Sequence, residues 1–188
     1  MAAPEEDSRT FVLQIDNHNR INYVDDEWLS FASENDAGYI TRDQVLNKHI
    51  FKFISGFETI LLYQLIFEKV RNKNKKVTVP FRCDSPDYRR YMYVECQPSS
   101  KDHITIISRL IKLLKREYVS LLDYKSERTD ETISICSWCK KVNIEKNIWV
   151  ETEVVDGILR TSPKLNPPKL SHTACPACYN GLMVIISA

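Results

Sequence analysis

Residues 11–24 read FVLQIDNHNRINYV, which places two runs of strand-forming residues on either side of the turn-forming stretch Asp16–Arg20. β-branched and aromatic residues favour strands, whereas Asp and Asn favour turns because their short side chains bond to the local backbone. The pattern therefore predicts a hairpin. Immediately after it, the acidic residues 25–27 can cap a short helix that starts near Trp28 and is ended by Gly38.

A longer helix is predicted between Gly56 and Arg71. Its apolar residues recur at three- and four-residue spacing, as one buried helix face requires. That face is expected to comprise Phe57, Ile60, Leu61 and Leu65. The basic stretch 69–76 that follows is interpreted as a solvated helix end, because it has no interleaved aromatic residues on which nucleic-acid bases could stack.

Three strands are predicted after this helix, at residues 77–81, 91–97 and 103–110. Pro80 has no N–H to donate to a neighbouring strand, so its strand is expected at a sheet edge or at a bulge. A hairpin, short helices, one long helix and three further strands make an α+β arrangement, with an antiparallel sheet and its helices on one side.

This order resembles the PAS domain, a sensor and interaction fold, over residues 10–114. The resemblance is carried by Ile15-Asp16 with Arg20-Ile-x-Tyr-Val24, which is similar to the family's usual start, and by Trp28-x-x-Phe31. It implies a five-stranded antiparallel sheet whose third strand is an edge. It also implies a cavity between sheet and helices that holds haem, flavin, another small molecule or nothing.

Several residues are candidates for lining that cavity. Flavin-binding light sensors of the family carry an Asn-Cys-Arg-Phe-Leu-Gln helix, which this chain lacks, and neither Cys83 nor Cys96 replaces its cysteine. A lone histidine such as His49 is more often packed or exposed than a haem ligand. Bulky aromatic residues favour a filled core, although a small-molecule ligand remains an alternative. The candidate lining is Trp28, His49, Phe51, Phe53, Phe57 and Leu61.

The C-terminal third contains two Cys-x-x-Cys pairs, Cys136/Cys139 and Cys175/Cys178. Each pair offers two thiolates from one tight turn, and two pairs complete the tetrahedral sulfur set that zinc prefers. One structural zinc ion per chain is therefore predicted, with a redox dithiol as the alternative. Four protein ligands leave no open position for an activated water, so a catalytic zinc is not expected.

Three further side chains belong to this prediction. His172 lies three residues before Cys175 and is either an alternative ligand or a residue that supports the ligands from outside. Lys140 and Lys141 are placed to offset the negative charge of a zinc tetrathiolate.

Residues 133–180 also resemble a cysteine-rich tail attached to bacterial PAS and response-regulator proteins. The chain keeps both cysteine pairs, Trp149 and Ser171-His172, but inserts a Pro-rich stretch at residues 162–169. The predicted organisation is a PAS-like domain at 10–114, a charged linker at 115–132 and a zinc-binding module at 133–188.

Composition narrows the function without naming it. The chain has 26 Lys+Arg against 25 Asp+Glu, so no overall charge recruits nucleic acid or anionic lipid. The first residues lack the features of a secretory signal and no apolar run is long enough to span a membrane, which predicts a cytoplasmic protein. In a reducing compartment six cysteines are better explained by metal than by disulfides.

We therefore expect a non-enzymatic bacterial regulatory protein that acts through a protein partner or self-association. The alternatives are a zinc-ribbon nucleic-acid-binding regulator and a thiol–disulfide redox protein. Residues 130–188 hold as many acidic as basic side chains, which argues against a phosphate-binding face. The expected partner surface comprises Arg82, Asp84, Asp87, Arg89 and Arg90.

Overall fold

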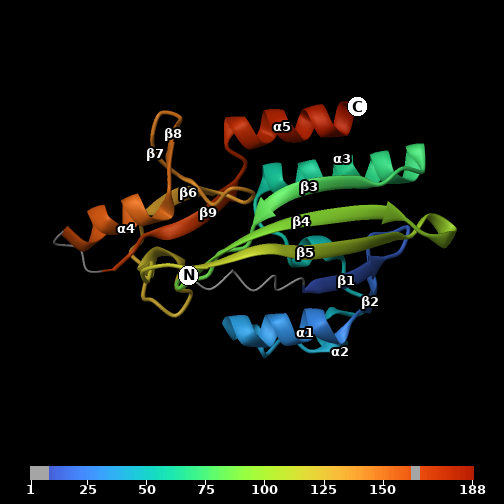
Figure 1. The fold of residues 1–188 in the computed structure, drawn as a ribbon, viewed down its shortest axis with the longest axis horizontal. Coiled ribbons are helices and arrows are strands. Elements are labelled where there is room, and N and C mark those ends of the chain that lie inside the picture. Colours follow the sequence, from blue (N-terminus) through green and yellow to red (C-terminus); the bar gives the residue numbers. More distant parts are fainter. Residues whose placement is uncertain (1–8, 162–165) are drawn as a thin grey trace, which may run out of the picture.

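A computed structural model describes residues 9–161 and 166–188 of the chain. Its largest element is an antiparallel five-stranded sheet with the order β2-β1-β5-β4-β3, which lies at the centre of the molecule (Figure 1). The strands are β1 (Thr10–Ile15), β2 (Ile21–Val24), β3 (Val77–Arg82), β4 (Tyr88–Pro98) and β5 (Ile104–Lys115). The predicted α+β, PAS-like sheet is confirmed, and β3 lies at its edge as Pro80 requires.

The β1–β2 hairpin leads directly into helix α1 (Asp26–Ala32). The Asp25 carboxylate caps this helix by accepting the N–H of Trp28 at 2.8 Å, and it also accepts the N–H of Val12 in β1 at 2.9 Å. One side chain thus fixes the helix start against the sheet. The chain continues as a π-helical turn, η1 (Ser33–Ala37), and this turn ends at Gly38 as predicted.

Two short elements then precede the long helix. They are α2 (Arg42–Val45) and a 3₁₀ turn at residues 50–52, whose Val45 and Ile50 side chains are buried. Because each is only one turn long, neither produces a periodic apolar pattern that sequence reasoning can recognise.

Helix α3 (Phe57–Lys73) forms where the sequence predicted it, but the predicted buried face was wrong. Phe57 is 78% exposed. The residues that do reach the core are Thr59, Leu62, Ile66, Phe67 and Val70. Apolar residues occur on more than one side of α3 because the C-terminal helix α5 (Pro176–Ser187) runs alongside it (Figure 1). In the described part of the chain no helix has the length and apolar character needed to cross a membrane.

One face of the sheet forms the core with these helices. Its strands contribute buried side chains that join those of α3 and the turns before it in a common cluster. They are Ile15, Val77, Val79, Val94, Cys96, Ile104 and Ile106. The opposite face carries more exposed residues such as Thr78, Pro80 and Tyr93, the last of them 44% exposed. The alternation follows from the two-residue period of a strand.

A second, four-stranded sheet occupies the C-terminal third, with the order β8-β7-β6-β9. β6 and β9 are parallel, and α4 (Thr152–Thr161) lies in the long connection that a parallel pair needs. The remaining bounds are β6 (Thr132–Cys136), β7 (Val142–Glu145), β8 (Ile148–Val150) and β9 (Lys169–Thr173). The Pro-rich stretch was expected at 162–169; residues 162–165 lie outside the described residues, and Pro167 and Pro168 are buried.

Residues 115–132, expected to be a linker, are packed against the C-terminal part rather than free. Val119 and Leu121 are buried, and the Leu121 side chain has no exposed surface. The buried carboxylate of Asp156 in α4 accepts the Leu121 N–H at 3.1 Å and the Ser120 hydroxyl at 2.6 Å. The sequence analysis took this charged segment as a linker and missed its short apolar anchor, Val119 and Leu121. The domain boundaries themselves stay a prediction.

The corrected orientation of α3 can be tested with two substitutions of similar size. Leu62→Ala removes a fully buried side chain and should lower the free energy of unfolding by about 2–5 kcal/mol. Phe57→Ala, at an exposed position, should change it by no more than about 0.5 kcal/mol. Urea unfolding followed by circular dichroism measures both. A larger loss for Phe57→Ala than for Leu62→Ala would contradict the observed face.

Candidate metal centre

The sulfur atoms of Cys136, Cys139, Cys175 and Cys178 gather at one point, all within 4.8 Å of one another. The Cys139 and Cys175 sulfurs are 3.7 Å apart. Four sulfurs bound at about 2.3 Å to a tetrahedral metal lie about 3.8 Å from one another, whereas a disulfide is only about 2.05 Å long. The arrangement therefore has the size of a four-sulfur metal site.

The first pair of cysteines is shaped by a turn at the end of β6. The Lys140 N–H bonds to the Cys136 carbonyl at 3.0 Å, and the Cys136 N–H bonds to the Lys141 carbonyl at 2.8 Å. Lys140 adopts a left-handed backbone with φ of 60°, which lets the chain reverse directly after Cys139. Both thiols are thus presented from one tight loop.

The second pair of cysteines begins α5. Cys175 is the N-cap residue and Pro176 occupies the first turn, where its missing N–H costs nothing. The Cys175 sulfur accepts the Cys178 N–H at 3.5 Å, and the Cys136 sulfur accepts the Cys175 N–H at 3.3 Å. These donors and the positive end of the helix favour negative charge on sulfur.

Crowding at the site separates the acidities of the Cys136, Cys139 and Cys178 thiols. Hydrogen bonds from the Cys139 and Cys178 thiols lower the pKa of Cys136. The hydrogen bond with Cys136 raises the pKa of Cys139 to about 12 and also raises the pKa of Cys178. Like charges at this spacing oppose one another, so a full set of thiolates requires a cation among them. The Lys140 ammonium group, which was expected to offset the charge of the thiolates, donates a hydrogen bond to the Ser137 carbonyl at 2.8 Å.

His172 is not among the gathered ligands. It lies in β9 opposite Ile135 of β6, and its imidazole falls outside the group formed by the four sulfurs. Burial, followed by the nearby charge of Lys140, lowers the pKa of His172 and favours its neutral form. The His172 backbone instead lies close to Gly56. A Cβ added to Gly56 would be only 2.2 Å from the His172 carbonyl oxygen.

The residues between the first two cysteines connect the site to the five-stranded sheet. The Arg82 N–H at the end of β3 bonds to the Trp138 carbonyl at 2.7 Å. The Trp138 ring, which is buried, stacks on Tyr63 of α3 at 5.6 Å. The Ser137 and Thr59 hydroxyls lie 2.7 Å apart. The sequence analysis identified the cysteines but did not predict that their loop packs against α3 and β3. The large apolar Trp138 inside the Cys-x-x-Cys loop was the signal that could have indicated this.

The residues predicted to line a ligand cavity lie in different surroundings. Phe57 is exposed, and Phe53, which is also exposed, lines a surface cavity of about 340 Å³. Phe51 stacks on buried Phe67 at 6.0 Å, and the His49 ring accepts the Phe51 N–H. Trp28 packs against the hydrophobic core, and Leu61 is half-buried on α3. The set was chosen by residue type, but the helix phase and the short turns point its members in different directions.

The predicted partner surface is largely a buried ion-pair network. The Asp84 side chain has no exposed surface and pairs with the guanidinium groups of Arg82 and Arg116. Arg82 also binds the Glu151 carboxylate at 2.6 Å, and Arg89 binds Glu153 at 2.7 Å. The prediction is corrected for Arg82 and Asp84, which are buried. Local sequence patterns could not reveal the network, because Glu151 lies 69 residues from Arg82 and Glu153 lies 64 residues from Arg89.

This network links β3 and β4 to the start of α4. Arg116, directly after β5, pairs with Glu153 at 2.8 Å and also donates to the carbonyls of Ser85 and Pro86. Buried charges are tolerated only when they are paired in this way. Of the five residues predicted to form the partner surface, Asp87 alone is exposed, and Arg90 is half-buried.

Comparison with known proteins adds a weak likeness. No family model and no curated protein sequence matches the chain. Among solved structures, "The Aer2 Receptor from Vibrio cholerae is a Dual PAS-Heme Oxygen Sensor" matches at 11% identity and a TM-score of 0.37, covering 56% of this chain and 95% of that chain. The fold assignment rests on the strand order and pairing described above.

Loss of one ligand tests the metal centre. Cys139→Ser should weaken metal binding by more than about 100-fold and lower the melting temperature, because oxygen replaces one of four sulfur ligands. Cys83→Ser is the matched control, since Cys83 lies outside the sulfur group. Elemental analysis and thermal unfolding of both variants measure the effect. Equal metal content in the two variants would contradict the site.

Glu153 makes the stability contributed by the ion-pair network depend on pH. Burial acts to raise its pKa, but its own backbone N–H and the Arg116 and Arg89 guanidiniums outweigh this and hold the pKa at about 2. The ionised form is therefore favoured by folding. Its contribution is complete above the unfolded-state pKa of about 4.3 and is lost as the pH falls towards about 2.

Glu153→Gln should accordingly reduce the loss of stability between about pH 4.5 and pH 2 while lowering stability at neutral pH. Glu117→Gln, at an exposed glutamate directly after Arg116 that has no place in the network's ion pairs, should leave the profile unchanged. Chemical denaturation at a series of pH values provides the comparison. Parallel profiles for wild type and Glu153→Gln would show that this carboxylate does not contribute.

Proposed function

We propose that this chain is a non-enzymatic bacterial regulatory protein in which a PAS-like sensing or interaction domain is coupled to a structural zinc module. The observation that carries the proposal is the packing of the Cys136–Cys139 loop against the PAS-like domain, through Arg82 of β3 and through Tyr63 and Thr59 of α3. The four sulfurs would hold the zinc ion and leave no ligand position for water, which makes the metal structural.

Zinc is the metal that this donor set favours. A closed tetrahedral set of four sulfurs suits zinc or an iron–sulfur centre, and two Cys-x-x-Cys loops are the usual source of a zinc set. The metal would neutralise sulfurs that otherwise oppose one another's ionisation. It would also hold together two chain segments that are remote in sequence.

Coupling is supported by a common hydrophobic core. Cys136, Trp138, Cys175 and Leu182 belong to the same buried cluster as the inner face of the sheet. The metal would therefore stabilise the contact between α5 and α3 as well as its own loops. A change at the sheet can reach the metal module through β3 and α3, which gives the pair of units a route for signalling.

The two alternative functions have less support. Arg82, Arg89 and Arg116 are neutralised by Asp84, Glu151 and Glu153, so they are not available to bind nucleic-acid phosphates. A thiol–disulfide protein needs an exposed, reactive thiolate, whereas Cys136 and Cys175 are buried and a bound zinc would mask all four sulfurs. A protein partner or a second copy of the chain is therefore the proposed recipient of the signal.

The zinc assignment is tested on the natively purified chain. Native mass spectrometry should show one zinc ion per chain, and elemental analysis should agree. Iron with a sulfur-to-iron absorption band would replace zinc in the proposal, and absence of any metal would overturn it. The same spectrum reports the number of subunits and any retained small molecule.

Coupling requires a separate measurement, hydrogen exchange with and without a zinc chelator. Chelation should increase exchange in β3 and in the first turns of α3, because both contact the cysteine loop. The β1–β2 hairpin at the far edge is the internal control and should keep its protection. Loss of protection confined to residues 132–188 would leave zinc in place but contradict the coupling.

A further inference from the structure

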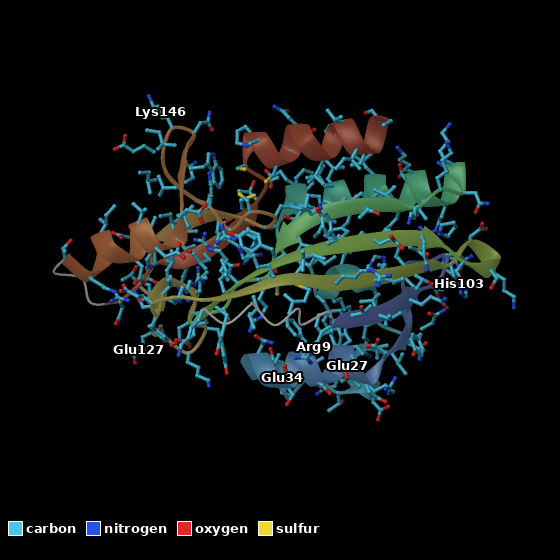
Figure 2. All side chains as sticks on the ribbon, in the orientation of Figure 1. Arg9, Glu27, Glu34, His103, Glu127 and Lys146 are labelled. Atoms are coloured by element: carbon cyan, nitrogen blue, oxygen red, sulfur yellow. The ribbon has the colours of Figure 1, made fainter. Side chains whose placement is uncertain are left out.

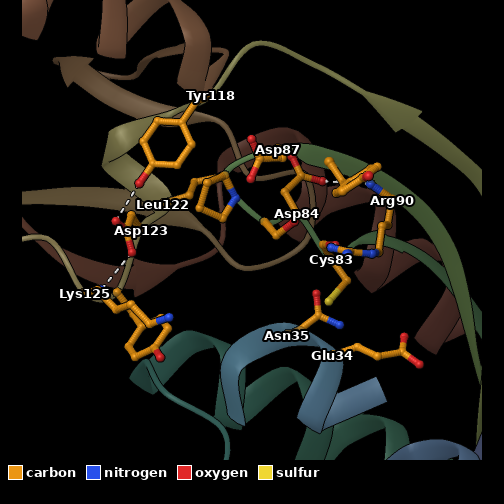
Figure 3. A pocket seen from close by; sticks show the side chains of 14 residues that line it. Glu34, Asn35, Cys83, Asp84, Asp87, Arg90, Tyr118, Leu122, Asp123 and Lys125 are labelled. Atoms are coloured by element: carbon orange, nitrogen blue, oxygen red, sulfur yellow. Dashed lines mark hydrogen bonds between the residues drawn. The ribbon is translucent and has the colours of Figure 1, made fainter. Parts of the chain in front are cut away.

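A cavity of about 420 Å³ lies away from the metal centre, at the end of the five-stranded sheet (Figure 3). Its walls come from η1, from the β3–β4 hairpin loop at residues 83–88, from Arg90 of β4 and from residues 118–125. A volume of this size falls within the range of about 300–1,000 Å³ that is typical of small-molecule sites. The walls join segments that are distant in sequence, so only the folded chain forms the cavity.

Most charged side chains in the walls already have partners. Asp84 is paired with Arg82 and Arg116. Glu34 binds Arg9 at 2.5 Å, and Figure 2 shows these two side chains together beside α1. Asp123 accepts the Tyr118 hydroxyl at 2.5 Å and the Lys125 N–H at 2.8 Å, as Figure 3 shows. These contacts build the walls and leave little capacity for a ligand.

Arg90 differs from the other wall residues. In residues 9–161 and 166–188 no carboxylate lies within ion-pair distance of its guanidinium. The group is held over the rings of Phe31 and Tyr88, with 5.5 Å to each centroid, and makes one long hydrogen bond to the Cys83 carbonyl. Aromatic contacts use the faces of a guanidinium and leave its edge N–H groups available for a carboxylate. Arg90 is thus a fixed cation with unused donors.

Asp87 supplies the opposite charge at the cavity wall. Its side chain is exposed, and within the described part of the chain its carboxylate has neither a hydrogen bond nor an ion pair. Glu34, Asp84 and Asp123 bring further carboxylates to the lining, and Lys125 brings a second cation. Because the carboxylates outnumber the cations, a ligand with several negative charges would be repelled here, whereas an ammonium group would be attracted. The cavity therefore places the fixed Arg90 cation beside a larger acidic region.

We propose that this cavity binds a small zwitterion of the amino-acid class, with Arg90 holding the carboxylate and Asp87 the ammonium group of the ligand. The proposal is independent of the identity of the metal. Because the Ser85 and Pro86 carbonyls in the same hairpin loop bond to Arg116, an occupied cavity would contact the ion-pair network that leads to α4.

The test uses the full chain and a defined series of compounds. Glycine, β-alanine and γ-aminobutyrate vary the spacing of the two charges, and α-amino acids from alanine to phenylalanine vary the side chain. Acetate, methylamine, succinate and inorganic phosphate are the single-charge and anionic probes. At a concentration about tenfold above its Kd, a matching zwitterion should raise the melting temperature by a few degrees. Calorimetry then gives the Kd.

Variants assign the two charges. Arg90→Gln and Asp87→Asn should each weaken binding by about tenfold or more, and Arg90→Lys should lie between wild type and Arg90→Gln. Arg109→Gln and Asp43→Asn, at exposed positions outside the cavity, should bind as wild type does. If Arg90→Gln lowers the melting temperature of the free protein, Asp87→Asn still carries the test because its side chain is exposed.

Three results would overturn the proposal. One is that no zwitterion in the series binds at millimolar concentration. Another is that acetate, succinate or phosphate binds as tightly as any zwitterion, which would leave no role for the ammonium group. The third is that binding survives unchanged in both Arg90→Gln and Asp87→Asn.

Discussion

The meeting of four cysteine sulfurs within 4.8 Å is the constraint on which the C-terminal half depends. It joins the end of β6 to the start of α5, two segments with α4 and three strands between them in the chain. Because Cys175 is also the N-cap of α5, the direction of this helix is set at the sulfur cluster, and its position along α3 and β3 follows. The Ser137-Trp138 dipeptide, displayed by the same turn, then contacts α3 and the end of β3.

The ion-pair network forms a second connection, which joins the β3–β4 hairpin to α4. Asp84 and Glu153 each bind more than one guanidinium, so the carboxylates are shared rather than paired singly. Removing these charged side chains from water is unfavourable, so their pairing adds little net stability. Their main effect is to disfavour alternative packings of the chain in which one of the charges would be buried without a partner. The network thus specifies how α4 lies against β3 and β4, while the sulfur cluster specifies α5.

Both connections and the cavity converge on the β3–β4 hairpin. The Arg82 backbone bonds to the cysteine loop, the Arg82 side chain enters the network, and Cys83 to Tyr88 form a wall of the cavity. Cys83 itself lies between these features, where burial raises the pKa of its thiol, and its sulfur lies outside the group of four. A small displacement of this one loop would reach the metal loop, α4 and the cavity together.

Local patterns were sufficient for much of the fold. Backbone preferences and spacing along the chain can be read directly from a sequence. They were enough to predict the β1–β2 hairpin, the Asp25 cap, the extent of α3, the edge position of Pro80 and the grouping of the four cysteines. Only the tertiary structure decided which side of α3 is buried, because α5 covers a second side. It alone buried Arg82 and Asp84, since Glu151 and Arg116 reach them from distant segments. Among the described residues it placed no carboxylate within ion-pair distance of the Arg90 guanidinium. Burial and charge pairing are properties of neighbours in space, and a linear sequence does not record which neighbours those are.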